Sequence, residues 1–246
     1  MNNESYFKEL QRRPRRIRVE EDEDDDDMLS MMLSGRRMLS AHAPVISIRG
    51  VITDKTAADF RSAVDALRFE RHSEVGLIRI NSTGGSVYAA MEMLNIMSES
   101  DIRWLTYNES HAFSAGALLL SKGEHGGRFM APMSRAMIHG LSAGIGFQGI
   151  EELRTEVQDL DHTNGLLLEE IAKNCGITVG KLKKAVADSG SRNLFLNAQE
   201  AKTLGLIDEI GVVSLEPVNG FQLKFTPAKE LKRSGKKDAC NGACKH

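Results

Sequence analysis

The sequence lacks any long uninterrupted run of apolar residues. No stretch contains the roughly 18 consecutive apolar residues that a membrane-spanning helix requires, so we expect no membrane partner. The first residues are charged throughout, unlike a secretory signal peptide, and we expect no such signal.

Cysteine is scarce, with three residues at Cys175, Cys240 and Cys244. A small, odd number argues against a disulfide scaffold and is typical of a reducing compartment, so we expect a cytoplasmic protein. Cys240 and Cys244 lie close to His246, but three candidate ligands in a Lys-rich segment are weak support for a metal site. We therefore expect neither a metal nor another cofactor.

The chain has almost no net charge: 32 Lys and Arg against 34 Asp and Glu give −2, which favours no particular partner. A basic run at 12–18 is followed by an unbroken acidic run at 20–27. The acidic run would compete with nucleic acid for the basic run, so we expect no nucleic-acid partner. Blocks of like charge cannot form a core, and residues 1–43 are predicted to be a polar, disordered extension.

Between the polar ends, strand-like and helix-like patterns alternate. The strands predicted from apolar runs are 45–52, 75–80, 102–107, 128–130, 135–139 and 206–210. The helices predicted from apolar spacing and caps are 56–70, 87–97, 147–174, 179–187 and 198–205. Repeated strand–helix units predict an α/β fold with helices packed on a largely parallel sheet. We expect one folded domain at 44–215 and a polar, Lys-rich tail at 216–246.

In such a sheet, functional residues gather at the carboxyl ends of the strands. Ser114 follows a predicted strand and opens a predicted helix, next to Ala115 and Gly116. This position directs a hydroxyl out of the sheet beside free backbone N–H groups, and a serine nucleophile needs both. A buried serine that only caps the helix is the alternative.

Two further loops end at the same edge of the sheet. Gly84 and Gly85 lack the G-x-x-x-x-G-K pattern of a phosphate-binding loop. Glycine also lets the backbone approach a ligand closely, and the N–H groups of Gly85 and Ala115 would form an oxyanion hole. His139 ends a strand and is the candidate general base, although a histidine at such a place is also commonly structural.

Segments in a fixed order carry a resemblance to a known family. They are 81–87 (NSTGGSV), 111–117 (HAFSAGA), 134–139 (SRAMIH), 195–201 (FLNAQEA) and 205–208 (GLID). Together they resemble the proteolytic subunit of the Clp protease, the ClpP family of serine peptidases, over about residues 44–212. The resemblance implies a ClpP/crotonase-type fold with a long protruding helix, Ser114 as nucleophile and His139 as general base.

The resemblance also implies how substrate and partners bind. A substrate backbone would lie as a strand between Ser86–Val87 and Leu141–Ser142. The subunits would form a homo-oligomeric stack of rings around a chamber, served by a Clp-type ATPase.

The sequence departs from the family pattern at several places. Thr83 stands where the family usually has proline, and the segment between His139 and Phe195 is a few residues longer than usual. Counting back from Phe195 aligns the family's third catalytic residue, an aspartate, with Asn193, while Asp188 is the alternative if the extra residues loop out. Asparagine can orient a histidine but supplies no charge.

The sequence therefore predicts a serine endopeptidase that degrades or processes proteins in an oligomeric chamber with an ATPase. Its departures suggest a divergent or phage-type member, so the substrate is an unfolded protein or a capsid protein. The alternatives are a phage head maturation protease that acts without an ATPase and an inactive ring subunit. A crotonase-type acyl-CoA enzyme would share the fold and the oxyanion hole without needing a Ser–His pair.

Overall fold

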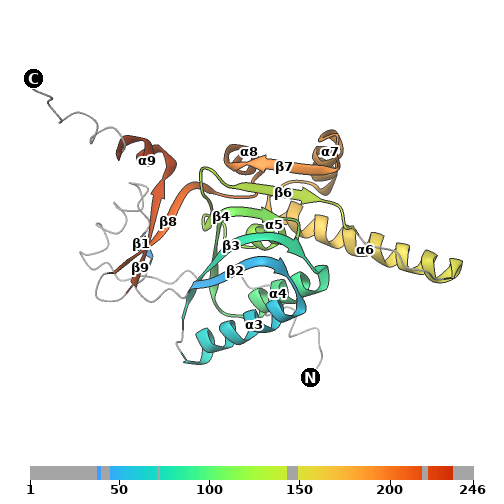
Figure 1. Ribbon diagram of the computed structural model, residues 1–246, viewed down its shortest axis with the longest axis horizontal. Helices are drawn as coiled ribbons and strands as arrows, with labels where there is room; N and C mark the ends of the chain where they lie inside the picture. The colour runs from blue at the N-terminus through green and yellow to red at the C-terminus, as the bar shows by residue number, and fades with distance from the viewer. Residues whose placement is uncertain (1–37, 40–44, 71–72, 143–148, 218–220, 235–246) are drawn as a thin grey trace, which may run out of the picture.

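The structure is a computed structural model that describes residues 38–39, 45–70, 73–142, 149–217 and 221–234. One mixed sheet forms its centre, with helices against one face and a long helix extending away from the body (Figure 1). The α/β fold predicted from the alternating patterns is confirmed. Within the described ranges, no helix is both long and apolar enough to cross a membrane.

Parallel strands make up the centre of the sheet. In spatial order they are β2 (Val45–Ile52), β3 (Val75–Gly85), β4 (Arg103–Phe113), β5 (Arg128–Met130) and β8 (Glu209–Pro217). The connecting helices are α3 (Asp54–Asp65), which continues as the π-helical turn η1 (Ala66–Glu70), α4 (Val87–Glu99) and α5 (Ala115–Ser121). The strand predicted at 102–107 is thus longer than expected and runs up to Ser114.

The sheet divides beside β4. The first half of β4 pairs with β5, whereas its last residues pair with β6 (Arg135–His139). β6 pairs on its other side with β7 (Asn193–Asn197), a strand that the sequence patterns did not predict. The remaining helices of this part are α6 (Ile150–Asn174), α7 (Val179–Asp188) and α8 (Ala198–Leu204). Because β4 continues past β5, its last residues lie beside residues 135–137 of β6, two residues before His139.

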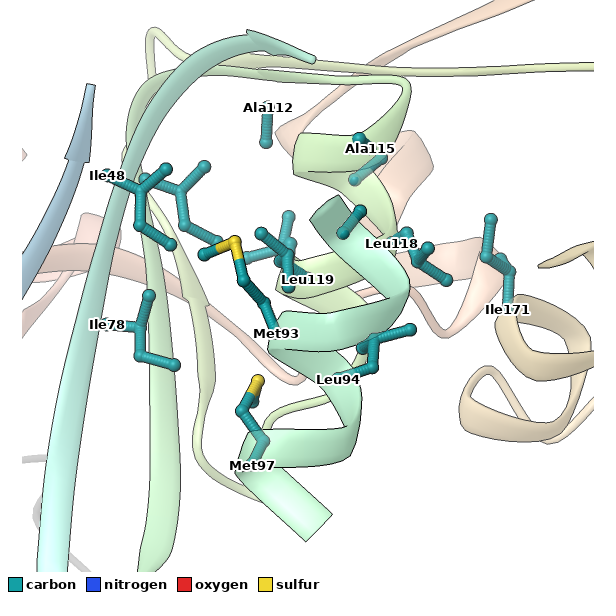
Figure 2. Packing of buried hydrophobic residues seen from close by; sticks show 14 of the residues in the cluster. Ile48, Ile78, Met93, Leu94, Met97, Ala112, Ala115, Leu118, Leu119 and Ile171 are labelled. Atoms are coloured by element: carbon teal, nitrogen blue, oxygen red, sulfur yellow. The ribbon is translucent and has the colours of Figure 1, made fainter. Parts of the chain in front are cut away.

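Apolar side chains fill the space between the sheet and the helices (Figure 2). Ile48 and Ile78 point from the strands toward Met93 of α4, while Ile171 reaches α5 from α6. This cluster fixes α5, and therefore the residue that precedes it, against both the sheet and α6.

A smaller cluster on the other face corrects one prediction. Part of the segment predicted to be a tail is folded: β9 (Phe221–Pro227) pairs antiparallel with β8, and α9 (Ala228–Ser234) follows it. Phe225 is buried against Phe129, with ring centroids 4.7 Å apart, and this packing holds the hairpin on the sheet. β1 (Met38–Leu39) pairs with β9.

Other predicted boundaries also shift. β8 begins at Glu209 rather than 206, because Asp208 turns its carboxylate toward Arg128 and the backbone of Gly126. The helix predicted at 198–205 is confirmed, with Asn197 and Glu200 forming its capping box. Residues 1–37 and 235–246, which include Cys240, Cys244 and His246, lie outside the described residues.

Candidate active site

Ser114 occupies a tight turn between β4 and α5. Its φ of 54° and ψ of −119° are unfavourable for a residue with a side chain, so the surroundings must hold this conformation. The Ser114 N–H donates to the Met137 carbonyl at 2.8 Å, and its own carbonyl accepts from Ala117 at 2.9 Å. Among the described residues the hydroxyl makes no capping bond, so it is not simply an N-cap serine.

Gly84 and Gly85 allow β3 to end directly against this turn. A Cβ on Gly84, whose φ is 89°, would lie 2.7 Å from the Phe113 carbonyl oxygen and 2.7 Å from the Ser114 Cβ. A Cβ on Gly85 would collide with the backbone of Ile52. Both positions therefore require glycine: Gly84 lets the end of β3 lie close to the serine, and Gly85 lets it lie against β2.

His139 meets Ser114 through the pairing of β4 with β6. The Nε2 of His139 lies 2.7 Å from the Ser114 Oγ, so a neutral imidazole can accept the hydroxyl proton. Burial lowers the pKa of His139 below its ordinary value of 6.5, which keeps the ring neutral at neutral pH. The structure thus brings together the predicted nucleophile and the predicted base.

Both side chains face a cleft of about 320 Å³. The apolar residues that line the cleft are Val87, Ala90, Ala115, Leu118, Met137, Leu141, Leu167, Leu168 and Ile171. Thr83 also lines the cleft, at the position where proline was expected. In the described part of the chain, no group of three His, Cys, Asp or Glu side chains is placed to hold a metal ion.

The predicted oxyanion-hole donors lie at the same cleft. Gly85 and Ala115 both line it beside Ser114. Ala115 is the first residue of α5, where a backbone N–H has no acceptor within the helix. These positions suit the predicted role of the two N–H groups as oxyanion-hole donors, which stays a prediction.

Of the four residues predicted to bind the substrate, three line the cleft and Ser86 does not. Val87, Leu141 and Ser142 line the cleft. Ser86 instead uses its polar groups within the chain: its N–H donates to Ile52, its carbonyl accepts from Ala90 and its hydroxyl accepts from Ala89. Pairing with a substrate on this side would therefore fall to the neighbours of Ser86.

Asn193 is the cross-strand partner of His139 at the end of the β6–β7 pair. Side chains at such positions lie close together, but among the described residues no hydrogen bond joins the Asn193 amide to His139. Asp188 is exposed at the end of α7, and within the same residues it too makes no hydrogen bond to His139. The choice between Asn193 and Asp188 stays a prediction, and the strand register favours Asn193.

Asn164 was not singled out in the sequence, yet it lines the cleft from α6. Its Oδ1 accepts a hydrogen bond from the Leu141 N–H at 2.8 Å. The signal was a polar residue at helical spacing from Leu167, Leu168 and Ile171, in the apolar stripe that covers the cleft.

These features define a class of protein. A serine hydrogen-bonded to a histidine at the carboxyl end of a largely parallel sheet, with backbone donors beside it, is the arrangement of serine hydrolases. A family model described as Clp protease matches residues 25–214, and the chain belongs to that family.

Individual relatives agree with this assignment. The chain is 30% identical, over 74% of its length and 88% of the relative, to the ATP-dependent Clp protease proteolytic subunit 2 of Corynebacterium glutamicum. It is 30% identical to proteolytic subunit 1 of Corynebacterium jeikeium, over 68% of this chain and 86% of the relative. It is 34% identical to proteolytic subunit 1 of Rhodopirellula baltica, over 53% of this chain and 56% of the relative.

Proposed function

We propose that the protein is a serine endopeptidase of the Clp type, with Ser114 as nucleophile and His139 as general base. The observation that carries this proposal is the 2.7 Å hydrogen bond between the Ser114 Oγ and the His139 Nε2 at the cleft. The membership in the Clp protease family supports it.

The proposed reaction uses groups already in contact. The Ser114 Oγ attacks the peptide carbonyl carbon while the His139 Nε2 takes the hydroxyl proton. The oxygen that becomes negative would accept hydrogen bonds from the N–H groups of Gly85 and Ala115. His139 then gives its proton to the departing amine, and water hydrolyses the acyl-enzyme by the same route.

The relatives suggest how the peptidase would work in an assembly. Their names describe proteolytic subunits of ATP-dependent Clp proteases, so we propose a homo-oligomeric ring stack served by a Clp-type ATPase in the cytoplasm. The substrate would be an unfolded protein, or a capsid protein if the chain acts without an ATPase.

A second candidate function is an inactive ring subunit. The observation that favours it is Asn193, which stands beside His139 without a negative charge. An inactive subunit would keep the fold and the assembly but would not turn over peptides.

Labelling with a fluorophosphonate probe tests the proposal, with Ser114→Ala as the matched control. We expect the wild type to be labelled and to cleave unfolded casein or short peptides, alone or with a Clp ATPase, and the variant to do neither. Ser114→Ala should lower kcat by several orders of magnitude, because the catalytic residues act as a unit. An unlabelled, folded wild type would favour the inactive subunit or a crotonase-type enzyme.

A further inference from the structure

The backbone that follows His139 leaves the sheet and enters the cleft. β6 ends at His139, and Gly140, Leu141 and Ser142 line the cleft without belonging to a strand. Among the described residues, one side-chain hydrogen bond reaches this segment, from the Leu141 N–H to the Asn164 Oδ1 on α6. Asn164 therefore ties this part of the cleft wall to the long helix.

The surroundings of Asn164 make this bond hard to replace. Its helix neighbours Leu167, Leu168 and Ile171 are apolar and line the same cleft, and the latter two are buried. Without the amide oxygen, the Leu141 N–H would lose its acceptor beside an apolar surface, which is unfavourable. Residues 140–142 would then have to become ordered each time a substrate binds, at a cost in conformational entropy.

We propose that Asn164 is a positioning residue that holds the substrate-binding backbone of residues 140–142 in place for a peptide substrate. The inference rests on the proposed peptidase function. Because the Leu141 N–H already donates to Asn164, it is not available to a substrate. A substrate strand would therefore pair with the backbone of Gly140 and Ser142 rather than with the Leu141 N–H.

Two substrates of different size separate this role from a general loss of structure. A fluorophosphonate needs only Ser114, His139 and the oxyanion hole, whereas a peptide of several residues also needs the backbone at 140–142. We expect Asn164→Ala to lower kcat/KM for the peptide by about tenfold more than the rate of labelling, mainly through a higher KM, since one hydrogen bond is lost.

The conservative variant Asn164→Asp keeps the acceptor oxygen and should restore most of the peptide turnover. Its charge lies in the same cleft as His139 and should move the acid limb of the pH profile upward. Glu169→Ala, an exposed change on the same helix, is the matched control and should not change the ratio of the two rates. If Asn164→Ala does not fold, Asn164→Leu removes the acceptor and keeps the side-chain volume.

The possible outcomes test the positioning role of Asn164 separately from the proposed peptidase function. Equal losses of labelling and peptide turnover in Asn164→Ala, or no loss of either, would overturn the positioning role while leaving the peptidase intact. Failure of Asn164→Asp to recover peptide turnover would also overturn it. A folded wild type that neither reacts with the probe nor cleaves peptides would overturn the proposed function, and the inference with it.

Discussion

Asn193 is the residue at which this chain differs most from a charged catalytic triad. An asparagine can hold the tautomer of His139 but cannot stabilise the imidazolium that forms during acylation. We expect low basal activity and a gain of up to about a thousandfold in kcat for Asn193→Asp, since the converse change costs a serine protease about 10⁴. Turnover of one peptide at one pH measures the gain.

Asp188→Ala is the companion variant for this prediction. With Asn193 as the orienting residue, Asp188→Ala should have little effect, because Asp188 is exposed at the end of α7. Asp188 would instead be the triad acid if Asp188→Ala abolished activity while Asn193→Asp changed nothing.

The pH dependence of activity should follow His139. Burial lowers the pKa of His139 below 6.5, and only the neutral ring can accept the Ser114 proton. The kcat/KM of the wild type should therefore decline on the acid side with a midpoint below pH 6.5, at the pKa of His139 in the folded protein. In Asn193→Asp the new carboxylate should raise that pKa and move the decline to higher pH. A wild-type midpoint above pH 6.5 would contradict this assignment.

At the scale of elements, an ion pair between a buried arginine and a partly buried aspartate connects β5 to the start of β8 and the end of α6. Arg128 is 3% exposed and donates to Asp208 at 2.6 Å and to the Asn174 carbonyl at 2.7 Å. Burial alone would raise the pKa of Asp208, but hydrogen bonds from Arg128, its charge and the Gly126 N–H together lower it. The ionised carboxylate is therefore the form that stabilises the fold.

Asp208→Asn should lower the free energy of unfolding by about 3 kcal/mol at pH 7, because it leaves Arg128 buried without its counter-ion. The pKa of Asp208 is lower in the folded state, so the pair contributes fully above the unfolded value of 3.8 and its contribution is lost as the pH falls through the folded value. Urea unfolding should show a smaller difference in the free energy of unfolding between the wild type and Asp208→Asn at pH 3 than at pH 7.

Asp59→Asn is the matched control for this prediction. Asp59 pairs with Lys55 on the surface of α3, and both side chains are at least 66% exposed. Its removal should cost about 0.5 kcal/mol or less. An equal cost for the two variants would contradict the structural role of Asp208.

At the scale of the whole molecule, α6 extends beyond the body (Figure 1). Ile150 and Val157 are 71% and 48% exposed, and Leu153 and Leu160 follow the same spacing of three and four residues. Apolar residues at this spacing form a seam along one side of a helix, and such seams are typical of helices that pair. In the proposed ring stack, a second copy of the chain would cover it.

The double variant Ile150→Glu/Val157→Glu should therefore sediment as a smaller species than the wild type at micromolar concentration. Gln158→Glu, an exposed change on the same helix, is the control and should sediment like the wild type. A double variant that keeps the wild-type sedimentation coefficient would show that α6 is not the assembly surface.

The sequence by itself determined the elements whose signals are local. Apolar spacing predicted α3, α4, α6 and α7, and the capping box at Asn197 marked the start of α8, because a helix face and a cap depend on residues a few positions apart. The motifs around Gly84, Ser114 and His139 indicated the family because each motif is also made of residues only a few positions apart. Local sequence patterns did not predict β7, which is stabilised by pairing with the distant strand β6. They also did not predict the folded hairpin after residue 216, which is held by the packing of Phe225 on the distant Phe129.

Only the tertiary structure decided how the site is assembled. Ser114 and His139 meet because β4 continues past β5 and pairs with β6, and that pairing is a property of the sheet rather than of either segment. Asn164 reaches Leu141 only because α6 packs across the cleft. No local sequence pattern around either residue predicts this contact. Local propensity acts over a few residues, whereas the chemistry here depends on distances set by packing between elements far apart in sequence.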